Sequence, residues 1–364
     1  MTCPKTPDRT RFATVVHSNT KPTFDTAPSS SDAGFSLDLN RRLPILVTGV
    51  SGVAGYSLFY DLRRSLGDQV FGTRPEKTTR LVGDGIVGTN LSEPDNVRRL
   101  IHEHGIRTVV NCGGSCHLKG CELDHEMAHR VNVKCVDHLL RAIEGTMVRL
   151  VHLSIDLVFS GDGEGGYVET DTPDPVTMYG KTMVMAEQLV LERRPESAIL
   201  RISLPMGVSF NGHAGAIDWI QHRFAKNLPA TLYYDEVRSP TYVDCLNRVI
   251  KEFCCRSDLS GIWHAGGDVY LSLYQIAQIV NRVGGYDPEL LRGCPRIDAG
   301  PMPPRAGNVT MNSSKLMRTL GRKPFLPWPL DHEFLPTDKS WHLVRDGSIG
   351  RPPQLIQERL YRHG

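Results

Sequence analysis

The chain has 364 residues, which is long enough for two domains and for a hydrophobic core that is stable without disulfide bonds or metal ions. Its 40% hydrophobic and 23% charged residues are the composition of an ordinary soluble globular protein. A formal net charge of +2 argues against a nucleic-acid or membrane-surface partner, and no apolar run approaches the ~20 residues that span a bilayer.

Residues 1–41 differ in composition from the rest of the chain. They are rich in Ser, Thr and Pro, and they lack the apolar segment of a secretory signal. Acidic residues such as Asp8 and Asp25 interrupt the basic character that an organelle transit peptide needs. We predict a disordered leader, with a misplaced start codon or a transit peptide as alternatives.

From Leu43 onward, short β-rich segments alternate with helical stripes. Strands are predicted at 44–48, 69–72, 108–111 and 150–153, and helices at 56–66, 92–101 and 136–143. Ser92, with Asp95 three residues later, resembles a capping box that opens the second of these helices. The alternation predicts an α/β fold, a Rossmann-type doubly wound parallel sheet with right-handed crossovers.

Beyond residue 205 the alternation loosens. Two further helical stripes occur at 243–253 and 273–280. We predict an NAD(P)-binding Rossmann domain over 42–204, to which parts of the later chain return, and a smaller mixed α/β substrate-binding lobe over 205–330. The lobe should pack at the carboxyl edge of the sheet, where substrates usually bind. Residues 331–364 form a weakly patterned tail.

The nine cysteines form no regular framework. The one cluster that could suggest a metal site is Cys112, Cys116, His117 and Cys121. Its spacings do not match zinc patterns, so we predict reduced structural thiols and no metal. Cys254 and Cys255 are expected within a helix, and a reducing cytoplasm is the expected compartment.

A glycine-rich loop directly follows the first predicted strand. Gly49, Gly52 and Gly55 are spaced by three, and Val53 and Ala54 lie where the next helix begins. Glycines let the backbone approach a pyrophosphate, and the helix N-terminus supplies N–H donors and partial positive charge. This context predicts dinucleotide binding, with an ordinary strand–helix turn as the alternative.

The second predicted strand ends at Thr73 and Arg74, about twenty residues past the glycines, where the adenosine ribose would bind. An arginine there accommodates the 2′-phosphate of NADP, whereas a carboxylate favours NAD. We therefore predict NADP(H) in preference to NAD(H). A solvated Arg74, with Glu76 near the ribose, keeps NAD open.

These motifs resemble an extended short-chain dehydrogenase/reductase, and more closely the dTDP-4-dehydrorhamnose reductase group, over about residues 44–320. The likeness rests on the glycine loop, Asn111–Gly114, Glu122, Val131–Val133, Asp235–Asp244, Arg305 with Asn308, and Ser313–Leu316. It implies further cofactor contacts from Asn90, Leu91, Cys112, Gly113, Gly114, Asn132 and Tyr179.

The resemblance also implies a catalytic triad, and this chain departs from it. In the family a Tyr donates a proton to the substrate carbonyl, a Lys four residues later lowers the Tyr pKa, and a Ser or Thr binds the carbonyl. Tyr179 matches the proton donor, but Ile155 and Met183 occupy the other two positions. Lys181 lies roughly 200° around the helix from Tyr179 and should face solvent. Ser154 should face away from Ile155, unless the strand turns there.

Without a neighbouring cation, Tyr179 is expected to titrate near ~10, too high for efficient proton exchange at neutral pH. Cys116 and His117 lie in the loop that would face substrate. His117 is either a replacement acid or a hydrogen-bonded loop residue. Arg238 is either a diphosphate ligand or part of a surface salt bridge.

Two functions remain open. One is an NADP(H)-preferring oxidoreductase with an atypical site, acting on a sugar nucleotide or a similar small carbonyl substrate. The other is a non-catalytic regulatory or scaffold protein of the same fold, because the regulatory subunit of methionine adenosyltransferase resembles this family too. A homodimer or a partner enzyme would suit the second.

Overall fold

The structure is a computed structural model that describes residues 39–212, 215–300, 302–345 and 354–361. The leader predicted over 1–41 lies almost entirely outside these residues. The described chain begins with Leu39, which is buried against the core beside the first strand.

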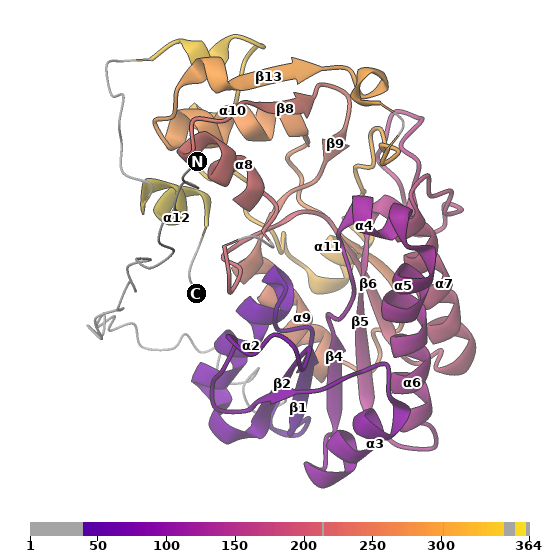
Figure 1. Ribbon diagram of the computed structural model, residues 1–364. Coiled ribbons are helices and arrows are strands. Elements are labelled where there is room, and N and C mark those ends of the chain that lie inside the picture. The colour runs from indigo at the N-terminus through magenta and orange to yellow at the C-terminus, as the bar shows by residue number, and fades with distance from the viewer. Residues whose placement is uncertain (1–38, 213–214, 301, 346–353, 362–364) are drawn as a thin grey trace, which may run out of the picture.

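The centre of the molecule is a seven-stranded parallel sheet (Figure 1). Its strand order is β11-β6-β5-β4-β1-β2-β3. The strands are β1 (Ile45–Thr48), β2 (Val70–Arg74), β3 (Ile86–Gly88), β4 (Thr108–Asn111), β5 (Arg149–Ile155), β6 (Ala198–Ile202) and β11 (Gly261–Ala265). This arrangement confirms the predicted Rossmann-type doubly wound sheet.

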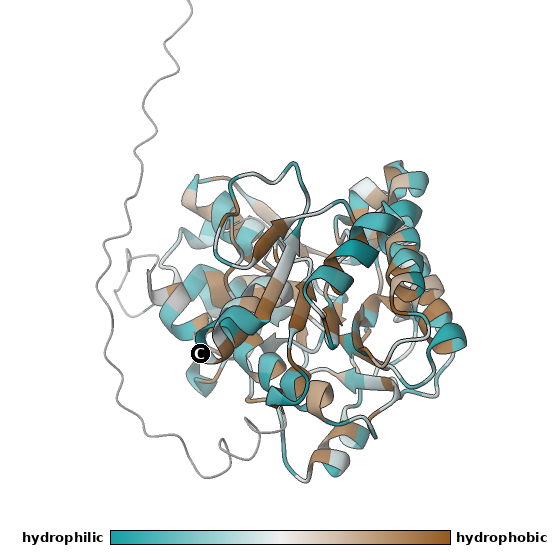
Figure 2. Ribbon diagram, turned by 90° about the horizontal axis from the view of Figure 1, so that it is seen from below, coloured by the Kyte–Doolittle hydropathy of each residue, from teal (hydrophilic) through white to brown (hydrophobic). Residues whose placement is uncertain are grey.

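Helices cover both faces of the sheet. On one face, α2 (Val53–Leu66) packs against α9 (Val243–Cys255). On the other face lie α3 (Pro94–Glu103), α6 (Cys135–Ala142) and α7 (Met178–Arg193). Two short helices, α4 (Leu118–Leu123) and α5 (His125–His129), precede a π-turn, η2 (Arg130–Lys134). Figure 2 shows hydrophobic residues along the strands and hydrophilic residues on outer helix surfaces, the pattern that buries both sheet faces.

A smaller set of elements lies over the carboxyl ends of the strands (Figure 1). It comprises α8 (Asp218–Ala225), α10 (Leu273–Val283) and the strand pairs β8 (Ala230–Tyr233) with β13 (Leu291–Cys294) and β9 (Val237–Arg238) with β12 (Leu271–Ser272). The remaining elements are β7 (Pro205–Met206), β10 (Thr241–Tyr242), α11 (Ser314–Leu320), α12 (Gln354–Leu360) and the 3-10 turns η1 (Gly67–Gln69), η3 (Asp156–Val158), η4 (Pro288–Leu290), η5 (Arg296–Ala299), η6 (His332–Phe334) and η7 (Trp341–Leu343).

The chain passes more than once between the two predicted domains. Helix α9 and strand β11 fall within the lobe predicted over 205–330, yet both pack into the Rossmann layers. The tail is also in contact with the body of the protein, because the Trp328 indole donates to the Leu360 carbonyl at 2.9 Å. We retain the division near residue 204 as a proposal, with α9 and β11 as the parts of the later chain that return to the Rossmann domain.

The capping box predicted at Ser92 is wrong. Helix α3 begins at Pro94, its N-cap is Glu93, and no side chain caps it. The Ser92 hydroxyl lies instead 3.5 Å from the Cys135 thiol. A proline at the first helical position already has a helical φ and has no N–H to satisfy, so this helix starts without a serine cap.

The structure also bears on the cysteines and on helix length. Cys254 and Cys255 end α9, which confirms the helix predicted for them. Within the described ranges, no three His, Cys, Asp or Glu side chains come close enough together to hold a metal ion. None of the described helices has the length and apolar character needed to cross a bilayer.

Candidate functional site

A cleft of about 360 Å³ opens at the carboxyl ends of the central strands, between the sheet and the lobe. Its sheet side is formed by the glycine loop and by the segments that follow β4, β5 and β6. Its lobe side comes from α8, β8, β9 and α10. Most of the lining is apolar. The cleft therefore lies where parallel α/β sheets usually bind ligands.

The glycine loop has the geometry of a phosphate cradle. Gly49 has φ of 68°, and a Cβ there would lie 2.5 Å from the Cys112 carbonyl oxygen. A Cβ on Gly55 would overlap the Gly49 carbonyl oxygen. Gly52 is the N-cap of α2 and offers no capping side chain, so the first N–H groups of this helix are directed to the cleft that Gly52, Val53, Ala54 and Gly55 line.

Substituting Gly55→Ala is expected to weaken NADPH binding at least ~10-fold, because relieving the clash with Gly49 must move the N–H donors that would bind the pyrophosphate. Calorimetric titration measures the affinity, and circular dichroism checks that the fold remains. The matched control is Gly163→Ala, since a Cβ on Gly163 meets nothing within 4 Å. Unchanged affinity in the Gly55 variant would show that the pyrophosphate does not bind this loop.

At the end of β2, two buried donors lack partners. The Thr73 hydroxyl and the Arg74 Nε have no hydrogen-bond partner among the described residues. Arg74 Nη1 donates to the carbonyls of Pro75 and Glu76 at 3.1 Å each, so the guanidinium is held at the strand end. Buried donors without partners are costly, and a ribose phosphate placed here would satisfy them.

The other predicted cofactor residues fall into two groups. Cys112, Gly113 and Gly114 line the cleft, whereas Asn90 is exposed and its Oδ1 accepts from the Ser92 N–H at 3.1 Å. Leu91 is half-buried and packs toward Gly113.

Asn132 is buried within the π-turn η2. Its Oδ1 accepts from the Ser115 N–H at 2.7 Å, and its Nδ2 donates to the Thr182 hydroxyl at 2.9 Å. Asn132 thus ties the loop after β4 to α7, and it orders the wall that carries Tyr179.

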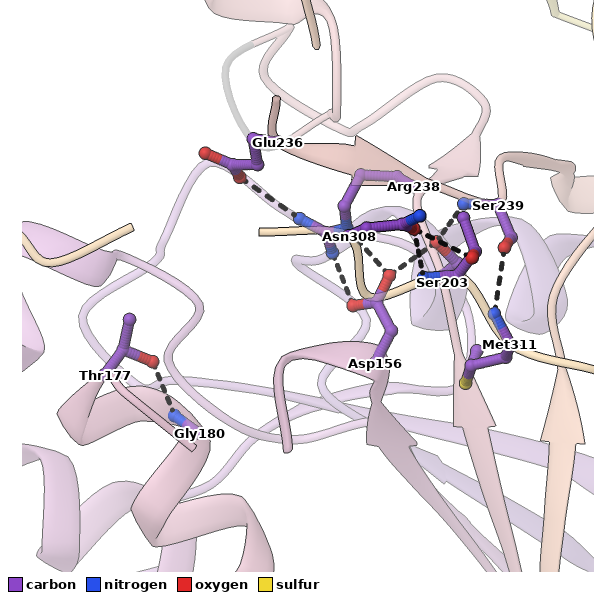
Figure 3. A network of polar contacts seen from close by, with 10 residues as sticks. Asp156, Thr177, Gly180, Ser203, Glu236, Arg238, Ser239, Asn308 and Met311 are labelled. Carbon is purple, nitrogen blue, oxygen red and sulfur yellow. Dashed lines mark hydrogen bonds and ion pairs between the residues drawn. The ribbon is translucent and has the colours of Figure 1, made fainter. Parts of the chain in front are cut away.

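The three triad positions meet in the cleft. Tyr179 and Met183 lie one turn apart on α7, Ile155 ends β5, and all three line the cavity. The Thr177 hydroxyl caps the start of α7 by accepting the Gly180 N–H at 3.0 Å (Figure 3). Among the described residues that line the cleft there is no lysine. The site retains the phenol and lacks both the ammonium and the second hydroxyl.

The pKa of Tyr179 is higher than the ordinary value expected from the sequence. Burial is the main cause, and the nearby Cys116 and Asp156 add to it, while the Arg238 guanidinium opposes it. Tyr179 is 8% exposed, Met183 is 5% exposed, and both belong to one buried apolar cluster, so a thioether occupies the position where a cation would be needed. Proton release from this phenol at neutral pH is therefore unfavourable.

Neither nearby polar residue replaces the missing groups. The Ser154 hydroxyl donates to Glu187 Oε1 at 2.5 Å, and Glu187 forms a buried ion pair with Arg201 at 2.7 Å. This bond commits Ser154 to the packing between β5 and α7. Lys181 is exposed on α7, which confirms the prediction that it faces solvent.

Cys116 lines the cleft, but His117 does not belong to its lining. The His117 ring lies over Gly120 in the first turn of α4, 2.5 Å from where a Cβ on Gly120 would be. The position of His117 in the sequence suggested that it could replace the missing acid. The structure places its imidazole on the exposed side of this loop, outside the lining of the cleft.

Arg238 forms a buried ion pair, so its interpretation as a surface salt bridge is wrong. Its Nε and Nη2 donate to the two Asp156 oxygens at 2.7 and 2.5 Å. Ser203 donates its hydroxyl to Asp156 at 2.5 Å and accepts the Ser239 N–H at 3.1 Å (Figure 3). The network joins the end of β5 to β9 and so fixes the lobe against the sheet.

The sequence analysis missed most of the lobe wall. The missed residues lining the cleft are Leu204, Pro205, Trp219, Ile220, Leu232, Glu236, Leu273 and Ile276. Arg305 also lines the cleft, and the sequence analysis named it only as part of the resemblance. A signal existed for Glu236, because it lies inside the segment Asp235–Asp244 that carries the resemblance. The apolar residues come from separate elements with no local motif.

Three comparisons with known proteins indicate the family and the fold of this chain. The model of the RmlD substrate binding domain family matches residues 43–330. The dTDP-4-dehydrorhamnose reductase of Mycolicibacterium smegmatis is 26% identical over 287 residues, which are 78% of this chain and 82% of that protein. The methionine adenosyltransferase 2 subunit beta of Mus musculus is 26% identical over 321 residues, 82% of this chain and 89% of that protein. The crystal structure of dTDP-4-dehydrorhamnose reductase from Bacillus anthracis in complex with NADP has a TM-score of 0.68 at 21% identity, over 78% of this chain and 95% of that chain.

Proposed function

Since this chain belongs to the RmlD substrate binding domain family, we propose that its cleft binds NADP(H) beside a sugar nucleotide and that the protein binds these ligands without rapidly reducing a carbonyl group. The observation that carries the proposal is the pairing of Ile155 and Met183 around Tyr179 in the cleft wall. A dinucleotide site is present, and the groups that would move a proton at neutral pH are replaced by apolar side chains.

The cofactor part of the proposal rests on the fit between residues and ligand. The N–H groups at the start of α2 suit a pyrophosphate, and the unpartnered Thr73 and Arg74 donors suit a phosphorylated ribose. Structurally similar proteins were solved with NADP or with NAD, so this likeness supports a nicotinamide dinucleotide of either kind. The preference for NADP(H) over NAD(H) rests on the Thr73 and Arg74 donors alone.

Bound NADPH would supply a hydride, and this chain's own residues would control the proton. Tyr179 would orient a ligand carbonyl by hydrogen bonding, while burial holds its proton on the phenol oxygen. Met183 and Ile155 would exclude water without stabilising the developing alkoxide. Binding and orientation are preserved, and efficient proton transfer is not.

A second candidate is a slow reductase with an atypical site, favoured by the retained Tyr179 phenol in the cleft. Juxtaposing cofactor and carbonyl still contributes to rate, even without a tuned proton donor. Slow but measurable NADPH-dependent reduction by the unsubstituted protein would favour this candidate over the first.

The binding role also suggests a partner. The relative from Mus musculus is the beta subunit of an adenosyltransferase and spans most of this chain. We propose that this protein likewise works within an assembly, either as a homodimer or with a partner enzyme. Size-exclusion chromatography with light scattering, with and without NADPH, tests this directly.

The decisive test of the function is a calorimetric titration with NADPH and, in parallel, NADH. We expect NADPH to bind more tightly, and Arg74→Ala to weaken NADPH binding by about 10- to 100-fold while leaving NADH nearly unchanged, the range of a charge-assisted hydrogen bond. Lys77→Ala, on the exposed loop after β2, is the matched control. If neither NADPH nor NADH bound, the proposed function would be refuted.

A further inference from the structure

Glu236 is a buried carboxylate in the lobe wall of the cleft. The residue is 2% exposed, and its backbone carbonyl accepts the Leu273 N–H at 2.9 Å, which fixes β9 beside the start of α10. Its Oε1 lies 3.6 Å from Arg238 Nη1, and its Oε2 lies 3.9 Å from Arg305 Nη1. Both distances exceed those of a hydrogen bond.

One oxygen of this carboxylate lacks a hydrogen-bond donor. Glu236 Oε2 is buried and has no hydrogen-bond partner within the described part of the chain. In Figure 3 one carboxylate oxygen is turned toward Arg238, and the other is directed away from the network. Two guanidinium groups lie within ion-pair distance of Glu236, but neither is close enough to donate a hydrogen bond to Oε2, so a ligand that supplies a donor would recover free energy.

The rest of the network is complete without Glu236. Asp156 already takes two nitrogens of Arg238 and the Ser203 hydroxyl. Burial raises the pKa of Glu236, and the neighbouring Arg238 and Arg305 guanidinium groups oppose that rise. A neutral donor suits Glu236, and an anion placed against its oxygen would be repelled.

We propose that Glu236 recognises the sugar group that a bound sugar nucleotide carries on its diphosphate. The unpartnered oxygen of Glu236 would accept a hydrogen bond from a hydroxyl of that sugar group. This inference rests on the proposed function and names the residue that selects the ligand. The surrounding wall, which includes Leu232 and Ile276, is apolar and excludes water from that bond. Glu236 is thus a specificity residue rather than a proton donor.

The test compares ligands that differ only in the sugar. Calorimetry in the presence of NADPH measures UDP-glucose against UDP, and dTDP-glucose against dTDP, in the unsubstituted protein and in Glu236→Ala and Glu236→Gln. We expect the sugar to tighten binding in the unsubstituted protein, and Glu236→Ala to remove ~10-fold or more of that gain. Affinities for UDP, dTDP and NADPH should stay unchanged. Asp235→Asn is the matched control, because Asp235 faces Arg296 outside the cleft.

Thermal unfolding without ligand separates recognition from a structural role. A recognition residue with an unpartnered oxygen should give Glu236→Gln a melting temperature equal to or above that of the unsubstituted protein. A clear decrease would show that the carboxylate holds the lobe through Arg238 and would overturn the inference. The inference would also be overturned if the sugar nucleotides bound no more tightly than UDP and dTDP while NADPH still bound. Loss of NADPH binding itself would instead refute the proposed function.

Discussion

Substituting Met183→Lys together with Ile155→Thr is expected to raise NADPH-dependent reduction of dTDP-4-dehydrorhamnose by ~10²–10⁴-fold, the usual contribution of a positioned proton-transfer system. Both positions line the cleft beside Tyr179, so the new ammonium and hydroxyl would enter the cavity. The ammonium should lower the pKa of Tyr179, which burial now raises. The rate–pH profile should therefore shift to lower pH.

Two control variants and the two single restorations make this experiment specific. Met183→Leu keeps the wall apolar, and Met185→Lys adds a charge to α7 at an exposed position, so neither should gain activity. Each single restoration should gain less than the pair, because triad members act as a unit. A double variant that folds, binds NADPH and shows no gain would mean that the cleft serves other chemistry and is not a silenced reductase site.

Substituting Asp156→Ala is expected to lower the free energy of unfolding by about 3–5 kcal/mol, because it removes the carboxylate that accepts two hydrogen bonds from the buried Arg238 guanidinium and leaves only Glu236, 3.6 Å away. Asp156 is fully buried and Arg238 is 4% exposed, so water cannot replace the lost partner. The pair joins the sheet to the lobe, and the variant should also lose affinity for sugar nucleotides. Denaturant unfolding followed by circular dichroism gives the stability.

A double-mutant cycle identifies the cause of this loss. Adding Arg238→Leu to Asp156→Ala removes the uncompensated charge and should recover much of the stability. Asp258→Ala removes a carboxylate from an exposed pair with Arg256 and should cost at most ~1 kcal/mol. If Asp156→Ala cost no more than the surface variant, the buried pair would not be what fixes the lobe.

Local sequence patterns are sufficient for the central fold. The strand predicted at Thr108–Asn111 has the same bounds in the structure, and the stripes at 243–253 and 273–280 correspond to α9 and α10. Apolar periodicity is a property of neighbouring residues, so it can be read without knowing the fold. The predicted cap at Ser92 fails because Pro94 decides the start of α3.

The residues of the site are only partly open to sequence analysis. The glycine loop and the triad positions have fixed spacings, so Gly49, Tyr179 and Met183 can be assigned from motif and resemblance. The exposed position of Lys181 results from helical geometry alone.

The sequence by itself determined the parallel α/β fold and the glycine loop, because each depends on residues close together in the chain, and its resemblance to a known family identified the replacement of two triad groups. Only the tertiary structure decided that Arg238 is buried against Asp156, 82 positions away, and that burial raises the pKa of Tyr179. It also decided that Glu236 faces the cleft with an unpartnered oxygen. Burial and charge pairing depend on which distant segments meet, and no local pattern encodes that choice.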